Sequence, residues 1–127
     1  MAFTALVTLL LLLQYLTFAM LVGRERLRHG IRAPAVTGHE NFERAYRVQM
    51  NTLEQLVVVV PAMWIVAGFF FLPIAAPLLG LAFFAGRVLY RNAYIRDPQT
   101  RRAGMAIGML SMLCLLILAF WGAIAQL

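Results

Sequence analysis

Four long stretches of apolar residues divide the chain, over residues 3–22, 56–72, 74–86 and 103–125, and none of them contains a charged residue. A helix needs about 20 mainly apolar residues to cross the hydrocarbon core of a bilayer. The first and last stretches have that length by themselves. The two middle stretches are shorter, so their helices must continue into polar sequence at one end.

Turn and capping signals indicate where the middle helices extend. Thr37 and Glu40 have the spacing of a capping box, so the second helix is expected to begin close behind them. The third helix continues to Arg96, and Asp97 followed by Pro98 is typical of a helix N-cap and first-turn proline. We therefore predict four membrane-spanning helices in one domain, residues 1–127, with helices over about 3–24, 41–71, 75–96 and 98–126.

Composition supports an all-α integral membrane four-helix bundle. Of the 127 residues, 63% are hydrophobic, and the mean hydropathy is +0.83, well above the value of ordinary soluble domains. The net charge of +6 comes from eleven basic residues, all arginine. They cluster between apolar segments rather than along a soluble face, which argues against nucleic acid as a partner. The single Cys114 and the two histidines have no metal-ligand spacing, so no metal is expected.

Arginine placement predicts the orientation. The loop after the first helix carries four arginines from Arg24 to Arg32, and the link between the last two helices carries Arg96, Arg101 and Arg102. The positive-inside rule then places this face in the cytoplasm and both termini outside. Alternatively, the loop arginines serve only as topology signals and as contacts with anionic membrane lipids. The absence of lysine and the short loops favour a bacterial inner membrane.

Polar residues recur at helical spacing where the middle helices approach the arginine face. Ionisable groups at membrane depth cost at least about 2.5 kcal/mol each. We therefore expect them to face the bundle interior, to pair with one another and to line a site for a small zwitterionic ligand with surplus negative charge. The alternative is a structural ion pair between Glu54 and an arginine, with interface-belt tyrosines. The residues are Arg47, Asn51 and Glu54 in the second helix, Arg87, Tyr90 and Tyr94 in the third, and Arg101 beyond it.

Two ordered motifs resemble the signatures of the MAPEG family, the membrane-associated proteins in eicosanoid and glutathione metabolism, which include microsomal glutathione transferases and leukotriene C4 synthase. The first is Thr37-Gly38 followed by the stretch from Asn41 to Glu54. The second is Arg87-x-x-Tyr90-x-x-x-Tyr94, then Arg101. The resemblance implies a homotrimer that holds one glutathione at each subunit interface, near the cytoplasmic face. The implied glutathione-binding residues are Arg26, Arg47, Gln49, Asn51, Glu54, Arg87, Tyr90 and Tyr94, with Arg28 as the alternative to Arg26.

The same resemblance implies a membrane-bound glutathione transferase. Arg101 is expected to stabilise the glutathione thiolate, with Tyr94 as a second catalytic candidate, and the co-substrate is a lipophilic electrophile drawn from the bilayer. Glutathione-dependent peroxidase activity is a plausible second reaction. Gln55 stands where leukotriene C4 synthase has a tyrosine, which weakens any assignment of an eicosanoid substrate. The alternatives are the family's non-catalytic lipid-binding scaffold and, in another class, a small four-helix exporter that uses Glu54 to couple protons.

Overall fold

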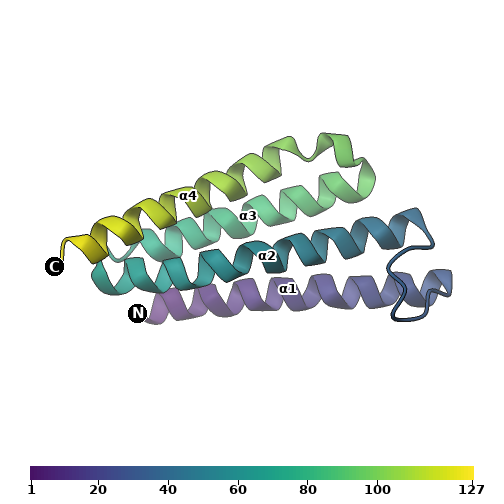
Figure 1. Cartoon of the computed structure of the whole chain (residues 1–127), viewed down its shortest axis with the longest axis horizontal. Helices are drawn as coiled ribbons and strands as arrows, with labels where there is room; N and C mark the ends of the chain where they lie inside the picture. Colours follow the sequence, from purple (N-terminus) through teal and green to yellow (C-terminus); the bar gives the residue numbers. More distant parts are fainter.

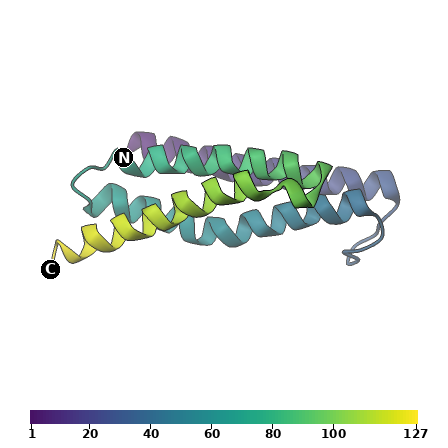
Figure 2. The same ribbon diagram turned by 90° about the horizontal axis from the view of Figure 1, so that it is seen from above.

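The computed structural model describes all residues 1–127 and contains four long α-helices and no strand. The helices run up and down in sequence order, so that both termini lie at one end of an elongated bundle (Figure 1). Helices α1 and α4 each pack against α2 and α3, whereas α1 and α4 scarcely contact each other. Figure 2 shows that α4 crosses the other helices obliquely. The helices are α1 (Ala2–His29), α2 (Glu40–Phe69), α3 (Ala75–Arg96) and α4 (Arg102–Ile124), with a 3-10 turn η1 (Pro98–Thr100) before α4.

The surface of the bundle is that of an integral membrane protein. Large apolar side chains are exposed along the outside of the helices, including Leu9, Val57, Leu110 and Phe120. Helices α1, α2 and α4 are each long and apolar enough to cross a membrane. Helix α3 has 22 residues, but its arginines make it less apolar. It packs along both α2 and α4 and completes the four-helix bundle that the sequence predicts.

The end of α1, the cap of α2 and the start of α4 differ from expectation, whereas α2 begins within a residue of the expected position. Helix α1 continues to His29 instead of ending near residue 24, because Gly30 adopts a left-handed conformation (φ 64°) and its N–H donates to the Arg26 carbonyl. Helix α2 is capped by His39, whose Nδ1 accepts from the Asn41 amide at 3.1 Å, so the capping box at Thr37 does not form. Asp97 does cap a helical turn, through Gln99 N at 3.1 Å, but that turn is η1.

Close packing of α4 on α3 depends on small residues. A Cβ atom on Gly104 would lie 2.3 Å from the backbone nitrogen of Tyr90, and one on Gly86 would lie 2.9 Å from the backbone nitrogen of Gly108. The Gly104-x-x-x-Gly108 spacing is typical of close helix packing, and these contacts show such packing between α4 and α3. They also determine where along α3 the first turns of α4 pack.

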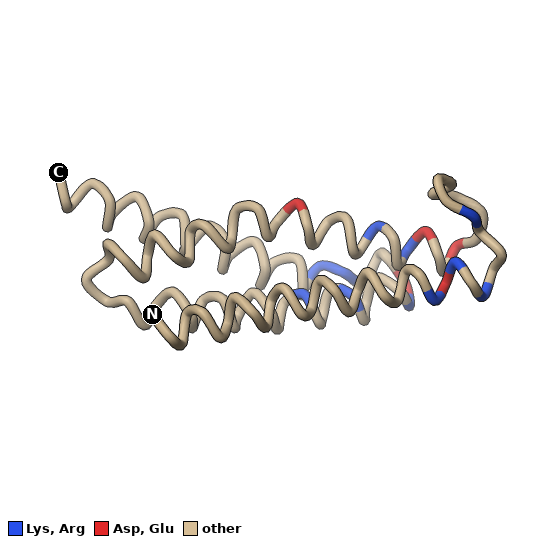
Figure 3. Tube along the Cα trace, turned by 90° about the horizontal axis from the view of Figure 1, so that it is seen from below, with Lys and Arg blue, Asp and Glu red and all other residues tan.

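Charged residues gather at the end of the bundle away from both termini (Figure 3). There, arginine side chains donate hydrogen bonds to backbone carbonyls at the end of a helix and in a loop. Arg44 of α2 donates from Nη1 to the carbonyls of Ile95 and Arg96 at 2.9 and 3.2 Å, which satisfies acceptors at the C-terminus of α3. Arg26 donates to the Ala35 carbonyl at 2.7 Å and fixes the loop between α1 and α2.

Candidate functional site

The centre of the candidate site is a guanidinium group buried among three helices. The side chain of Arg87 on α3 is fully buried. Its Nε and Nη2 both donate to Thr52 Oγ1, at 3.2 and 2.8 Å, and its Nη1 donates to Gln55 Oε1 at 3.2 Å. A buried cation without such acceptors would be strongly destabilising. Arg87 is therefore held in one position by two neutral side chains of α2.

Arg87 also contacts the first of two stacked tyrosines. Its guanidinium carbon lies 4.1 Å from the centroid of the Tyr90 ring, in a cation–π contact. The Tyr90 ring stacks on Tyr94 with centroids 5.4 Å apart and an interplanar angle of 22°. Tyr90 is buried against Phe18 and Val48, whereas Tyr94 is only half-buried. The stack thus leads from the buried guanidinium towards the charged end of the bundle.

Arg101 lies at the junction of η1 and α4, next to this stack. It is half-buried, and its Nη1 donates to the Pro98 carbonyl at 2.6 Å. Arg101 comes one turn before Gly104, which packs against the backbone of Tyr90. The structure therefore brings together Arg87, Tyr90 and Tyr94 and places Arg101 close to them.

Three polar residues of α2, called the stripe below, point away from the bundle interior and not into it as expected: Arg47, Asn51 and Glu54. Arg47 and Glu54 are exposed and Asn51 is half-exposed on the outside of this single chain, and none of these side chains forms a hydrogen bond or ion pair within it. The interior positions of α2 are Val48, Thr52 and the residues that follow at helical spacing. One residue turns a helix by about 100°, so the stripe is rotated away from the core. The expectation that these three residues face the bundle interior is wrong for the single chain, and the alternative of an ion pair between Glu54 and an arginine does not form within it either.

Two further predicted residues are engaged within the chain. Gln49 donates from Nε2 to the Tyr15 hydroxyl at 3.3 Å and so lies in the seam between α1 and α2. Besides its bond to the loop, Arg26 lies over the Phe42 ring, 4.6 Å from the centroid. Both side chains sit near the charged end of the bundle, but neither contacts the Arg87–Tyr90 group in this chain.

Comparison with known proteins decides the family. The model of the MAPEG family matches residues 4–121. The chain belongs to the MAPEG family. The match spans all four helices, including every candidate site residue described above.

Relatives of this MAPEG chain align over most of its length. It is 41% identical to an uncharacterised protein of Synechocystis sp., over 97% of this chain and 89% of the relative. It is 37% identical to microsomal glutathione S-transferase 2 of Homo sapiens, over 88% of this chain and 77% of the relative. It is also 37% identical to leukotriene C4 synthase of Cavia porcellus, over 98% of this chain and 83% of the relative. These similarities support a transferase function of the MAPEG type and do not favour the exporter alternative.

Sequence reasoning missed several residues that organise the site of this MAPEG protein. Thr52 and Gln55 hold Arg87, yet an isolated threonine or glutamine in an amphipathic helix carries no signal of its own. A combined signal does exist, because Val48, Thr52 and Gln55 have i, i+4, i+7 spacing and mark the interior face. Arg91 was also missed, and it lies half-buried on the α1 side of α3.

Proposed function

We propose that this protein is a membrane-bound glutathione transferase that activates the glutathione thiol for attack on lipophilic electrophiles. One observation carries the proposal. The stripe of Arg47, Asn51 and Glu54 lies on the outside of α2 with no partner in the chain, beside exposed apolar residues. Leaving such groups in contact with lipid costs several kcal/mol, so a ligand and a second subunit must cover them.

The stripe has the chemistry to bind the glutathione backbone. Glutathione carries two carboxylates and one ammonium group. Guanidinium groups such as that of Arg47 form paired hydrogen bonds with carboxylates. The carboxylate of Glu54 can accept from the ammonium group, and the Asn51 amide can bond a peptide group. The homologous transferases named above support this choice of ligand.

The sulfur of such a ligand belongs near Arg101 and Tyr94. A free thiol has a pKa near 8.5, so only a few per cent is ionised at neutral pH. Lowering that pKa to 7 requires about 2 kcal/mol of preferential stabilisation of the thiolate, at 1.36 kcal/mol per pKa unit. A guanidinium beside the sulfur in a poorly solvated site can supply this amount. Within the chain, the Arg101 side chain donates only from Nη1, to the Pro98 carbonyl, which leaves further N–H groups for the sulfur.

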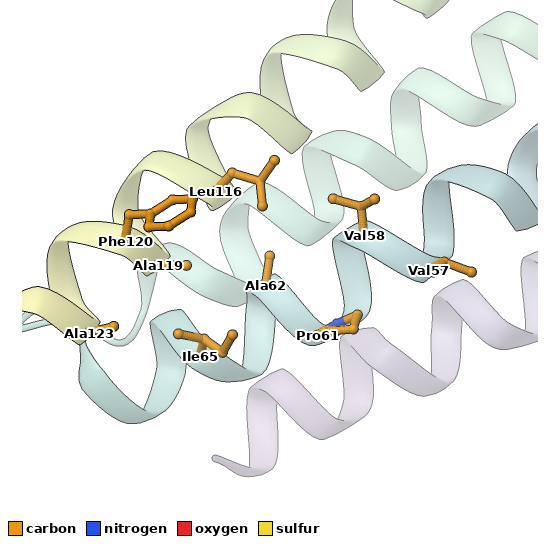
Figure 4. A pocket seen from close by; sticks show the side chains of 9 residues that line it. All are labelled: Val57, Val58, Pro61, Ala62, Ile65, Leu116, Ala119, Phe120 and Ala123. Carbon is orange, nitrogen blue, oxygen red and sulfur yellow. The ribbon is translucent and has the colours of Figure 1, made fainter.

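The electrophile is proposed to enter from the bilayer along α2 and α4. An apolar groove of about 340 Å³ lies between these helices (Figure 4). Val57 and Val58 begin the groove on α2, three and four residues after Glu54, and so lie on the same side of the helix. Phe120 borders it on α4. An apolar electrophile held there would present its reactive end towards the glutathione stripe.

The chemical step is a substitution or a conjugate addition. The thiolate sulfur forms a bond to the electrophilic carbon. A leaving group such as chloride departs with the electron pair, or the adjacent carbon takes up a proton in an addition. Reduction of a lipid hydroperoxide by two glutathione molecules, giving an alcohol, water and glutathione disulfide, is a second reaction open to the same thiolate. We further propose a homotrimer that spans a bacterial inner membrane, with its site at the cytoplasmic face and the stripe covered by a neighbouring subunit.

The test is conjugation of glutathione to 1-chloro-2,4-dinitrobenzene by the purified protein in detergent. Arg101→Ala is compared with Arg102→Ala, a neighbouring exposed arginine that serves as a matched control. We expect Arg101→Ala to lose most of its kcat while retaining glutathione binding in equilibrium dialysis. Binding without turnover in the wild type, with several electrophiles, would instead favour the lipid-binding scaffold. No binding of glutathione would rule out both the ligand and the reaction.

A further inference from the structure

A second groove runs along the outer seam between α1 and α3, on the far side of Phe18 from Tyr90 and away from the polar residues of α2. Its volume is about 240 Å³. Its apolar walls are formed by Leu10, Leu13 and Phe18 of α1 and by Phe84 and Val88 of α3. The residues from Leu10 to Phe18 span about 12 Å along a helix, close to the half-thickness of a bilayer core, about 15 Å. The groove therefore has the dimensions of a channel for one lipid acyl chain.

A cation closes the end of this groove that faces the charged end of the bundle. Arg91 follows Val88 by three residues on α3 and so lies on the same side of that helix. Its guanidinium carbon is 5.7 Å from the centroid of Phe18, a ring that also lines the groove. Arg91 thus lies next to the Phe18 end of the apolar groove.

Arg91 has no hydrogen-bond acceptor in the chain. It is half-buried, yet none of the chain's carbonyl or side-chain oxygens accepts a bond from it. The carboxylate of Glu25 on α1 bonds instead to Arg28 and His29, at 3.4 and 3.1 Å. A half-buried guanidinium is stabilised by a charge-assisted hydrogen bond to an anion. The chain supplies no such hydrogen bond, which leaves the N–H groups of Arg91 available to an anion from outside.

The surrounding charges select an anionic partner. Arg24 and Arg28 are exposed near the end of α1, and together with Arg91 they form a cluster of guanidinium groups at the charged end of the bundle. Each arginine near an anionic membrane surface contributes about 1 kcal/mol of attraction. The ammonium of a zwitterionic headgroup would be repelled by this cluster, whereas a headgroup with a net negative charge would not.

We propose that the α1–α3 groove is a binding site for one anionic phospholipid, with an acyl chain between α1 and α3 and the phosphate bonded to Arg91. The site is separate from the glutathione stripe on α2 and does not depend on the proposed reaction. The phospholipid links α1 to α3. Without it, α1 contacts α3 less extensively than it contacts α2. Binding of the lipid therefore stabilises the folded bundle.

The experiment is native mass spectrometry of the purified full-length protein after incubation with dioleoyl phosphatidylglycerol or dioleoyl phosphatidylcholine. The wild type should retain phosphatidylglycerol in preference to phosphatidylcholine, and its melting temperature should rise only with the former. Loss of a charge-assisted hydrogen bond should weaken phosphatidylglycerol binding in Arg91→Gln by about tenfold or more. The matched control is Arg32→Gln, which removes an exposed arginine of the same membrane face outside the groove and should change binding less than about twofold.

A groove-filling variant tests the acyl chain independently of charge. Val88 is exposed in the groove wall, and Val88→Phe should exclude the chain and lower phosphatidylglycerol retention without changing any charge. Equal retention of both lipids by the wild type would overturn the proposal. The proposal would also fail if Arg91→Gln and Arg32→Gln weakened phosphatidylglycerol binding equally, because the lipid would then be attracted by the general positive charge of the surface. A change of oligomer mass in the Val88 variant, with no lipid bound to the wild type, would instead make the groove a subunit interface.

Discussion

Arg87 of α3 directs two of its N–H groups, from Nε and Nη2, to a single hydroxyl oxygen, Oγ1 of Thr52 on α2. The Thr52 hydroxyl donates onward to the Val48 carbonyl at 2.7 Å. The guanidinium therefore connects to the backbone of α2 through one side chain, and its other face supports the Tyr90 ring. This buried connection sets the distance between the two helices at the level of the site.

Replacing Thr52 with valine should destabilise the bundle. Thr52→Val keeps the shape of the side chain but leaves two N–H groups of a buried cation without an acceptor, at a cost of about 2–4 kcal/mol. The midpoint of thermal unfolding in detergent, followed by circular dichroism, measures the effect. Thr52→Ser keeps the hydroxyl and should stay much closer to the wild type. Equal melting temperatures for the valine variant and the wild type would contradict the role of this bond.

Gly104 should be intolerant of even one methyl group. A Cβ atom there would lie 2.3 Å from the nitrogen and 2.6 Å from the Cα atom of Tyr90, so Gly104→Ala must push α4 away from α3. We expect a loss of about 2–4 kcal/mol in stability and reduced turnover, because Arg101 moves with α4. Gly23 is the control, since its surroundings within 4 Å are empty. Gly23→Ala should be neutral or stabilise its helix by about 1 kcal/mol.

The pH dependence of turnover should reveal the role of Arg101. If its guanidinium lowers the pKa of bound glutathione, removing it raises that pKa towards the value of the free thiol, about 8.5. The defect of Arg101→Ala in kcat should then be largest near pH 6–7 and shrink as the pH rises through 8.5. Rate profiles from pH 6 to 9.5, together with the thiolate absorbance of bound glutathione, measure both effects. A defect of constant size at every pH would assign Arg101 to positioning instead.

Glu54 should contribute to ligand binding and not to folding. It is exposed and forms no ion pair in the chain, so Glu54→Gln should change the melting temperature little. Loss of a charge-assisted contact with the ligand ammonium should raise the KM for glutathione by about tenfold or more. Glu43→Gln, an exposed carboxylate nearer the start of α2, is the control. A glutathione analogue without the amino group should bind the wild type and Glu54→Gln equally; a difference between them would argue against this contact.

Much of the site was predictable because helical periodicity places residues before any packing is known. The spacing of Tyr90 and Tyr94 predicts a shared face, and the two rings do stack. The spacing of the glycines at 104 and 108 is typical of close packing, and the backbone of α3 does lie against Gly104. By contrast, the cap of α2 was misplaced, because Thr37 and His39 are both capable caps and only the path of the loop decides between them.

The sequence by itself determined the class of the protein, its four apolar helices and the family to which it belongs, because these follow from hydropathy, local spacing and an ordered set of motif residues. Only the tertiary structure decided which face of each helix is inside. Asn51 and Thr52 are adjacent in sequence, yet their side chains point about 100° apart. Packing against α3 selected Thr52 as the partner of Arg87 and turned Asn51 and Glu54 outward. The reason is that a buried guanidinium needs acceptors at fixed positions, and only the arrangement of neighbouring helices determines which side chains can supply them.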